Sequence, residues 1–439
     1  MKNKLSILAF FLIFSGLNAQ KITLEEATRR ALENRQELKA QALQVRIAQA
    51  ANDKVRAQWL PQVSGTADFR WNTQLQTTQL PLGQFGIPGI DPSVTKEVAF
   101  GAPFNNTAGI QAEQKIYDGT RKIDRTLNDV QVMNAQNQLA QQQIDIRRAV
   151  AEAYYAVLYH REKVKLAEQT LARNQVNLES DQVRLKNGTA LKNDVDRLAL
   201  DVSNAQLSLK KARQDLALSL DNLRYLIRAD AGETLEPAED LAALMSAGNT
   251  DLSDSIETRP EIQAEEISMQ INALTQEKEL AQRRPTISAY GTYSVLQLHD
   301  EFNPFASGTW YPYNYLGVRF EVPIYNGKQA KLAASDYELR SQINRLNLEK
   351  LKSDFNYELQ SARKTLEQAQ LDLEESKKNI DLARQIFETD AFRFKQGVLL
   401  QNDLKNSELS LQTAENNYLA AVYNWLVAEL GYRKAAGRL

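Results

Sequence analysis

The chain of 439 residues contains no cysteine, which excludes several kinds of site at once. Without a thiol it can form no disulfide and no thiolate metal centre, and no cysteine is available to carry a lipid anchor. Only two histidines are present, His160 and His299. His160 follows an aromatic stretch within a helical pattern, and His299 lies among expected loop residues. We therefore predict no metal site and no cofactor.

Long apolar runs are also missing from most of the chain. An apolar run from Leu5 to Phe14 follows Lys2 and Lys4 and precedes Ala19, which predicts a cleaved secretory signal peptide over residues 1–19. No later segment has the ~18 consecutive apolar residues of a transmembrane helix, so entry into a membrane would require strands. Without the two lysines, 51 of the 53 basic residues remain against 55 acidic ones. This net charge of −4 excludes the basic surface of a nucleic-acid-binding protein.

Helix-breaking residues are absent from a long central stretch. Residues 120–187 contain neither glycine nor proline and would extend about 100 Å as one helix, at ~1.5 Å per residue. Apolar residues recur every seven positions here and in the second half: Val150, Val157, Val164, Leu171, Leu178 and Leu185, then Leu359, Leu366, Leu373, Ile380, Phe387 and Phe394. Such a repeat holds a seam between helices that coil left-handedly about one another. A second helix with the same period follows Gly188 and Gly397, so each half is predicted to end in a long antiparallel hairpin. A coiled-coil rod that only spaces other parts apart fits the same pattern.

Motifs recur between the two halves of the chain. Residues 34–38 and 60–64 are matched 224 positions later by 258–262 and 284–288, and residues 116–119 and 184–188 are matched 208 and 209 positions later by 324–327 and 393–397. This duplication predicts a pseudo-symmetric architecture, in which each half builds one sector of a larger assembly.

Four segments alternate apolar and polar side chains and are predicted to be strands, near 62–72, 107–117, 286–296 and 314–324. Strands of about 9 to 11 residues can cross a bilayer at a tilt. Aromatic residues at or beyond their ends are typical of an interfacial girdle: Trp71, Tyr117, Trp310, Tyr311, Tyr313 and Tyr325. A small soluble sheet is the alternative. Four strands cannot close a barrel, and lipid does not tolerate open edges, so several copies must contribute; three would give 12 strands.

These patterns divide the chain after the signal peptide into two repeats and a linker. The first repeat covers 20–228, with a helix, two strands and a hairpin over 119–228 whose tip is 187–191. The linker covers 229–254 and is expected on the outside of the helices at mid-height. The second repeat covers 255–439, with a helix, two strands and a hairpin over 327–434 whose tip is 396–401.

Three elements carry a resemblance to a known family: the strand-to-helix junction Val322-Pro323-Ile324-Tyr325-Asn326-Gly327, the entry segment Ala31-Leu32-Glu33-Asn34-Arg35, and the tip turns 188–195 and 397–404. With the order and spacing of the repeats, they make nearly the whole mature chain resemble the TolC family of outer-membrane efflux channels. The resemblance implies a mixed α and β membrane protein, a homotrimer with a 12-stranded outer-membrane β-barrel and a periplasmic α-helical coiled-coil barrel. It further implies a passive exit duct, not an enzyme, that contacts outer-membrane lipid and is served by an inner-membrane transporter and a periplasmic adaptor protein.

The hairpin tips are the part expected to carry specific function. Asp194 and Asp403 each follow a tip glycine by six residues. Repeated by three-fold symmetry, their carboxylates would form an acidic ring that favours cations and resists full closure. Equally, each aspartate could cap or support the first turn of its return helix.

Two tip positions depart from the family pattern. Leu399 and Asn406 stand where relatives carry a basic and an acidic residue, so an arginine–aspartate latch is not expected. We predict instead an apolar gate formed by Phe394, Leu399 and Leu400. Adaptor docking is expected at the turn residues Gly188, Thr189, Ala190, Gly397, Val398 and Leu399. An ordinary hydrophobic contact within the turns is the alternative.

A periplasmic coiled-coil scaffold or adaptor without a pore is the main alternative. Adaptors carry one helical hairpin flanked by compact β domains, whereas this chain has two equal hairpins, each preceded by two strands of membrane length. An enzyme is less consistent still, because no nucleophile, base and orienting group recur together.

Overall fold

The computed structural model describes residues 20–81, 91, 95–230, 233–247, 256–306 and 310–439, and the predicted signal peptide lies outside these ranges. The chain forms two compact units. We call the residues up to Gln44, Ala135–Glu266 and Leu346–Leu439 the helical unit, and Val45–Asn134 with Ile267–Arg345 the sheet unit.

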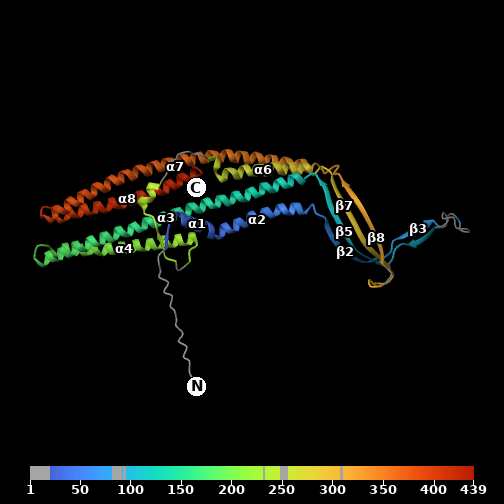
Figure 1. Cartoon of the computed structure of the whole chain (residues 1–439), viewed down its shortest axis with the longest axis horizontal. Coiled ribbons are helices and arrows are strands. Elements are labelled where there is room, and N and C mark those ends of the chain that lie inside the picture. The colour runs from blue at the N-terminus through green and yellow to red at the C-terminus, as the bar shows by residue number, and fades with distance from the viewer. Residues whose placement is uncertain (1–19, 82–90, 92–94, 231–232, 248–255, 307–309) are drawn as a thin grey trace, which may run out of the picture. The chain divides into compact units, whose positions relative to one another are not determined.

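Four long helices dominate the helical unit, although α3 and α7 begin in the sheet unit. They are α3 (Arg121–Lys186), α4 (Lys192–Ile227), α7 (Gln329–Lys395) and α8 (Gln401–Ala435). α4 folds back along α3, and α8 folds back along α7, so that each pair is an antiparallel hairpin (Figure 1). The shorter helices are α1 (Leu24–Asn34), α2 (Gln36–Ala57), α5 (Leu241–Ala247) and α6 (Pro260–Ala281), with a 3₁₀ turn η2 at Ile256–Thr258.

The seven-residue rows supply part of the buried surface of these hairpins. Val150 and Val157 are fully buried, and Leu373 and Ile380 are buried in the second hairpin. Toward the tips the same rows are only half-buried, at Leu185 for example. The main apolar core of the helical unit lies around Val150–Leu158, where α1, α4, α5 and α8 contribute side chains.

The linker between the two repeats packs into this core. Its strand β6 (Leu235–Pro237) pairs in parallel with the N-terminal strand β1 (Gln20–Ile22). Leu235 and Leu241 of the linker are buried in this core. The Tyr154 hydroxyl donates to the Ile22 carbonyl oxygen at 2.9 Å and also to the Glu239 carboxylate. The N-terminal strand is thus held by the linker and by α3.

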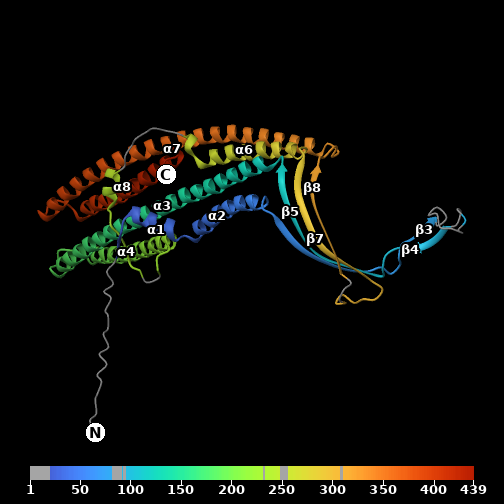
Figure 2. The same cartoon turned by 45° about the vertical axis from the view of Figure 1, so that its right-hand side comes forward.

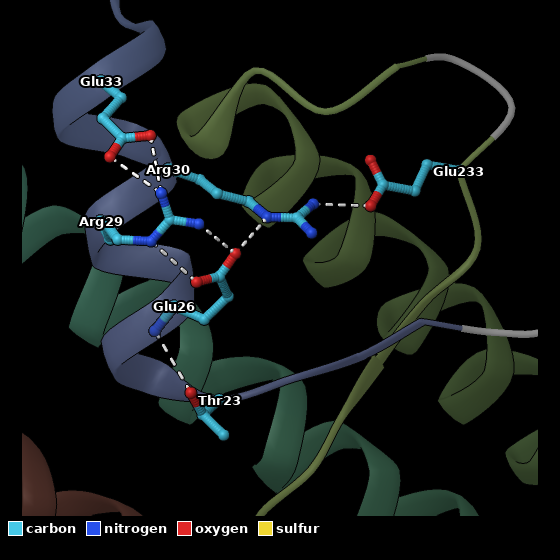
Figure 3. A network of polar contacts seen from close by, with 6 residues as sticks. All are labelled: Thr23, Glu26, Arg29, Arg30, Glu33 and Glu233. Carbon is cyan, nitrogen blue, oxygen red and sulfur yellow. Dashed lines mark hydrogen bonds and ion pairs between the residues drawn. The ribbon is translucent and has the colours of Figure 1, made fainter.

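A polar network ties α1 to the segment that follows α4 (Figure 3). Thr23 caps α1 by accepting the Glu26 backbone N–H at 3.2 Å. Glu26 accepts hydrogen bonds from Arg29 and Arg30, which lower the pKa of its carboxyl to about 2. Arg30 also pairs with Glu233 at 2.6 Å. Because both partners of that pair are mostly covered, it links α1 to the start of the linker.

The sheet unit contains a four-stranded antiparallel sheet in the order β2-β5-β7-β8. Its strands are β2 (Gln62–Trp71), β5 (Phe104–Asp118), β7 (Thr286–His299) and β8 (Trp310–Glu321), and Figure 2 shows them side by side. The two central strands come one from each repeat, since β5 pairs with β7 from Phe104↔His299 to Asp118↔Thr286. β2 and β8 are the edges, and each has one sheet neighbour in the described chain.

Strand ends differ from the expected bounds for identifiable reasons. β8 ends at Glu321 and not at 324, because Pro323 has no N–H to donate to a ladder. β5 and β7 extend to Phe104 and His299, beyond the predicted ends. The prediction stopped short because polar Asn106 and Gln297 break the apolar alternation near that end. β8 also starts earlier, through Pro312, which an edge strand tolerates.

The segment between β2 and β5, where the sequence pattern indicated no strand, contains a further pair of strands. β3 (Thr77–Pro81) pairs antiparallel with β4 (Thr95–Ala99) over five residue pairs, from Thr77↔Ala99 to Pro81↔Thr95. Short strands rich in Thr, Lys and Glu gave no clear apolar alternation, so the pattern missed them.

Candidate functional site at the sheet and the hairpin tips

The sheet has one mainly apolar face, set by strand alternation and register. In-register partners such as Val63↔Ala112, Ala112↔Gly291 and Gly291↔Leu316 place their side chains on this face. Its large members are exposed, with 68% of Val63 and 91% of Leu316 accessible. A single chain therefore leaves this face uncovered, whereas a soluble sheet would pack it on a core.

The opposite face is polar and carries charges of both signs. Its charged members are Asp68, Arg70, Glu113, Lys115, Asp118, Arg319 and Glu321. The Arg319 guanidinium lies 3.9 Å from the Glu113 carboxylate across β5, β7 and β8. The sheet thus separates an apolar surface from a hydrated one over its whole width.

Aromatic side chains mark one end of the apolar face. The Trp71 and Phe104 rings stack with centroids 6.3 Å apart, and the Trp310 indole N–H donates to the Pro304 carbonyl at 3.1 Å. Two residues expected in this girdle are on the other side, since Tyr311 and Tyr313 lie on the polar face by register. These tyrosines were predicted to join the girdle because they lie near strand ends, but the sequence pattern did not determine which face of the sheet they occupy.

Two amides interrupt the apolar face near the same end. Asn106 and Gln297 face each other in register and are fully buried. The Asn106 amide donates to the Gln297 side-chain oxygen at 2.9 Å, and the Gln297 amide donates to the Asn303 carbonyl at 2.8 Å. Their mutual hydrogen bond offsets part of the cost of removing both from water.

Each hairpin tip is a glycine turn with a left-handed backbone. Gly188 has φ 72° and Gly397 has φ 75°, and both are in open space. The N–H groups of Thr189 and Val398 reach back to the carbonyls of Arg184 and Arg393, at 2.8 Å and 3.1 Å, which closes the helix ends. Glycine is required here because other residues adopt this conformation at a cost.

Asp194 and Asp403 lie in the first turns of α4 and α8 and are not the caps. The caps are Leu191 and Leu400, neither of which makes a side-chain capping bond. The backbone N–H groups of the two aspartates donate to the carbonyls of Leu191 and Leu400, at 3.1 Å in both hairpins. Their carboxylates instead sit where the helix dipole favours negative charge.

Several apolar tip residues are accessible in the single chain. Val398 and Leu400 each expose 73% of their surface, and Leu191 is similarly exposed, while Phe394, Leu399 and Ala190 are partly covered. Thr189 is exposed, and its hydroxyl donates to the Arg184 carbonyl at 3.0 Å. The tips therefore offer apolar side chains beside turn backbone.

Polar contacts link the two hairpins near the tips, and sequence reasoning missed them. We call these residues the hairpin seam: Arg173, Arg184, Asp201, Gln401, Lys405 and Glu408. Lys405 pairs with Asp201 at 3.0 Å, Arg173 with Glu408 at 3.4 Å, and Arg184 donates to Gln401 at 3.3 Å. The Arg184 guanidinium also lies 5.6 Å from the centroid of the Phe394 ring. The hairpins are thus held by charges as well as apolar contacts, although not by the residues that relatives use.

A seven-residue spacing could have revealed part of the seam. Glu408, Glu415 and Glu429 fall in one row of α8 with Val422, and this row faces inward. Glu408 and Glu429 are buried, and burial raises the pKa of Glu415, opposed by Arg173 and Arg384. Acidic residues at repeated heptad positions thus signal buried ion pairs in this helix.

The two histidines lie in different environments. His160 is half-buried on α3, with its ring edge-on to Tyr159 at 5.2 Å, and burial lowers its pKa. His299 ends β7 and does not lie in a loop; its Nδ1 accepts the Glu301 N–H at 3.0 Å. Across the described ranges, no group of three or more His, Cys, Asp or Glu could hold a metal ion.

Among the residues that the structure describes, no helix has both the length and the apolar character needed to cross a bilayer.

Comparisons with known proteins agree with these features. Residues 27–227 match the family of outer membrane efflux proteins. No curated protein matches the chain. Solved structures share its fold: the CmeC outer membrane channel of Campylobacter jejuni (12% identity, 94% of this chain and 85% of that chain, TM-score 0.72), the open-state MtrE outer membrane channel of Neisseria gonorrhoeae (17%, 94% and 88%, 0.70), and the outer membrane protein VceC of Vibrio cholerae (14%, 94% and 96%, 0.66).

The match over residues 27–227 covers α1, β2, β5 and the first hairpin, and the structural likeness extends over the second half as well. The sequence match to outer membrane efflux proteins thus covers just under half of the chain, and the fold of the chain is that of the solved outer membrane channels.

Proposed function

We propose that the protein is an outer membrane efflux protein, the exit duct of a tripartite export system, and that it is assembled from three copies of the chain. The observation that carries the proposal is the open sheet, with one exposed apolar face, one polar face and two unpaired edges. In lipid an unpaired strand edge costs several kcal/mol per group, so the sheet must continue into other copies. Three sheets of four strands would close a 12-stranded barrel with its apolar face in lipid and its polar face around a water-filled pore.

The hairpins support the same assembly. Apart from the buried rows, exposed apolar residues recur seven positions apart, at Val176 and Val183 on α3 and at Leu200 and Leu207 on α4. Heptad rows left uncovered in one chain are suited to packing against the helices of a neighbouring copy. We infer that the hairpins of three copies form an α-helical coiled-coil barrel in the periplasm.

The tips are proposed to receive a periplasmic adaptor protein, which links the duct to an inner-membrane transporter. Exposed Leu191, Val398 and Leu400 beside the turns at Gly188 and Gly397 offer apolar contacts for tip-to-tip packing. The protein supplies a conduit and no chemical step, in keeping with a family of efflux proteins. Residues 1–19 are proposed as the cleaved export signal, and no lipid anchor is proposed.

Closure of the tip is proposed to rest on apolar contacts of Phe394, Leu399 and Leu400, beside a ring of Asp194 and Asp403 from three copies. Substitution Leu399→Ser should raise conductance and the leak of antibiotics into cells, because a hydroxyl weakens the apolar seal. Leu409→Ser, at an exposed position further along α8, is the matched control. Unchanged conductance and leak in Leu399→Ser would contradict an apolar gate.

The proposal as a whole is tested by recording currents from the purified full-length protein in planar bilayers, with its mass measured in detergent. A trimer with small, cation-selective conductance steps is expected. A monomer or dimer that never conducts would favour the alternative of a periplasmic coiled-coil scaffold without a pore.

A further inference from the structure

A column of tyrosines runs along β8 on the polar face of the sheet. Tyr311, Tyr313 and Tyr315 occupy alternate positions, so their side chains leave the strand on the same side. They expose 62%, 41% and 51% of their surfaces. The ring faces of this column are therefore accessible to a solute that moves along the polar face.

A fourth tyrosine extends the column on the neighbouring strand. Tyr290 of β7 is in register with Gly317, and a Cβ at Gly317 would lie 2.6 Å from the Tyr290 ring. The absence of a side chain at Gly317 thus lets the Tyr290 ring lie across β8. Its centroid is 6.1 Å from that of Tyr315, with the rings nearly perpendicular. Any larger residue at 317 would displace this ring.

The column already holds a planar cation of the protein itself. The Arg319 guanidinium carbon lies 5.0 Å from the centroid of the Tyr290 ring, within range of a cation–π contact. The ring faces on this side of the sheet are therefore positioned to accept flat, positively charged groups.

These tyrosines are not part of the aromatic girdle that marks the lipid-facing side. Trp71, Phe104 and Trp310 lie on the apolar face, whereas the tyrosines of the column lie on the polar face. On β7, the residues opposite Tyr313 and Tyr315 are Ser294 and Thr292, whose hydroxyl-bearing side chains are smaller than the rings. The seven charged residues of the polar face, four acidic and three basic, nearly balance in sign, so stacking on the rings is the selective chemistry that this face offers.

We propose that the column Tyr290, Tyr311, Tyr313 and Tyr315 is a contact path for planar aromatic solutes, cationic ones in particular, as they leave through the barrel. The inference rests on the proposed channel, in which the polar face lines the pore. Each ring makes a weak stacking contact, and several weak contacts in series let a solute enter and leave quickly, as conduction requires.

The test records single-channel currents with ethidium, a planar aromatic cation, added to each side of the bilayer in turn. Tetraethylammonium, a cation of equal charge without a ring, is the comparison solute. Ethidium is expected to interrupt the current of the wild-type channel, and the interruptions should be about tenfold shorter with Tyr311→Ser/Tyr313→Ser/Tyr315→Ser. The corresponding triple change to Phe should retain them, because it keeps the rings.

Tyr293→Ser is the matched control, because Tyr293 is equally exposed but lies on the apolar face. It should leave the interruptions unchanged. Equal interruptions by tetraethylammonium, or interruptions that survive the triple Ser change, would overturn the inference. If the triple Ser protein fails to insert, Tyr313→Ser alone should shorten the interruptions, and no shortening would count against the column. A wild-type protein without any current before solute is added would instead overturn the channel, and the inference with it.

Discussion

At the residue scale, the tip turns depend on glycine for a reason that is purely conformational. Gly188 and Gly397 have positive φ, and no other group lies within 4 Å of the point that a Cβ would occupy, so a substitution there meets strain and no clash. The sequence identified both turns, because glycine after a long uninterrupted heptad pattern is a helix end signal.

We expect Gly397→Ala to destabilise the protein by about 1 kcal/mol, the cost of a left-handed backbone for a residue with a Cβ. The measurement is the thermal unfolding midpoint in detergent. Gly431→Ala in α8 is the control, since Gly431 has ordinary helical φ and open space around it, and there alanine should be neutral or stabilising by about 0.5–1 kcal/mol. An equal response of the two variants would contradict the conformational explanation.

A second residue-scale feature is the buried guanidinium of Arg259. It exposes 4% of its surface, pairs with Glu358 at 2.7 Å and Glu261 at 3.0 Å, and lies 3.6 Å from the Phe355 ring centroid. Burial raises the pKa of Glu261, but the hydrogen bonds and charge of Arg259 outweigh it, and the net pKa is below the ordinary value. Arg35 pairs with Glu37 in the same spacing in the first repeat, at 3.0 Å.

A folded-state pKa below the unfolded value means that the Glu261 pair stabilises the protein above about pH 4.5 and less as pH falls through the folded pKa. Arg259→Met should therefore cost most stability near pH 7 and progressively less toward pH 4. Unfolding midpoints of both proteins across this range provide the measurement. Arg340→Met, at an exposed pair with Asp336, should show little difference at any pH. A pH-independent cost of Arg259→Met would show that lost packing on Phe355, and not the ion pair, is responsible.

At the element scale, the long helices and the four strands of the large sheet could be predicted from periodicity, and their ends and the short strands β3 and β4 could not. Heptads and the absence of Gly and Pro defined the hairpins, and alternation defined the four strands of the sheet. Alternation failed where Asn106 and Gln297 enter an apolar face and pair with each other, since a partner on another strand is invisible in a local pattern. Tyr311 and Tyr313 were assigned to the wrong surface for the same reason, because the face is set by register with β7.

The hairpin seam was missed because its charges come from helices distant in sequence. Arg173 on α3 is the counter-charge of Glu408 on α8, whose side chain is 5% exposed. Arg173→Met should destabilise the protein by about 2 kcal/mol, since it leaves the buried Glu408 carboxylate with Lys405, at 3.8 Å, as its remaining cation. Arg213→Met, at a pair with Glu168 in which both side chains are exposed, should cost less than about 1 kcal/mol. The unfolding midpoints of both variants are the measurement. An equally small loss of stability in both would mean that water already screens the ion pairs of the hairpin seam.

At the scale of the whole molecule, the described chain is incomplete as a membrane structure. The sheet leaves an apolar face exposed and the edges β2 and β8 unpaired, and the helices leave apolar rows exposed. The proposed closure by three copies would account for all three features together. A sequence can indicate that four strands are too few, but the number of copies follows from geometry between chains, which no pattern within one chain encodes.

The most direct test joins the edge strands β2 and β8 of neighbouring copies by a disulfide. Because the native sequence contains no cysteine, only the introduced cysteines can form this bond. Thr66→Cys on β2 is combined in turn with a cysteine at one of four positions on the same face of β8: Tyr313, Tyr315, Gly317 and Arg319. Opposed residues of paired strands lie within disulfide reach, so one combination should cross-link on oxidation. Ala67→Cys, which points to the other face, is the control and should not cross-link with these positions.

The measurement is a non-reducing gel of the oxidised protein from outer membranes. A ring closed by three copies predicts covalent species that end at the trimer. A ladder that continues beyond the trimer would mean that the edges join without closing, and a protein that stays monomeric in every combination would contradict the account that neighbouring chains complete the sheet.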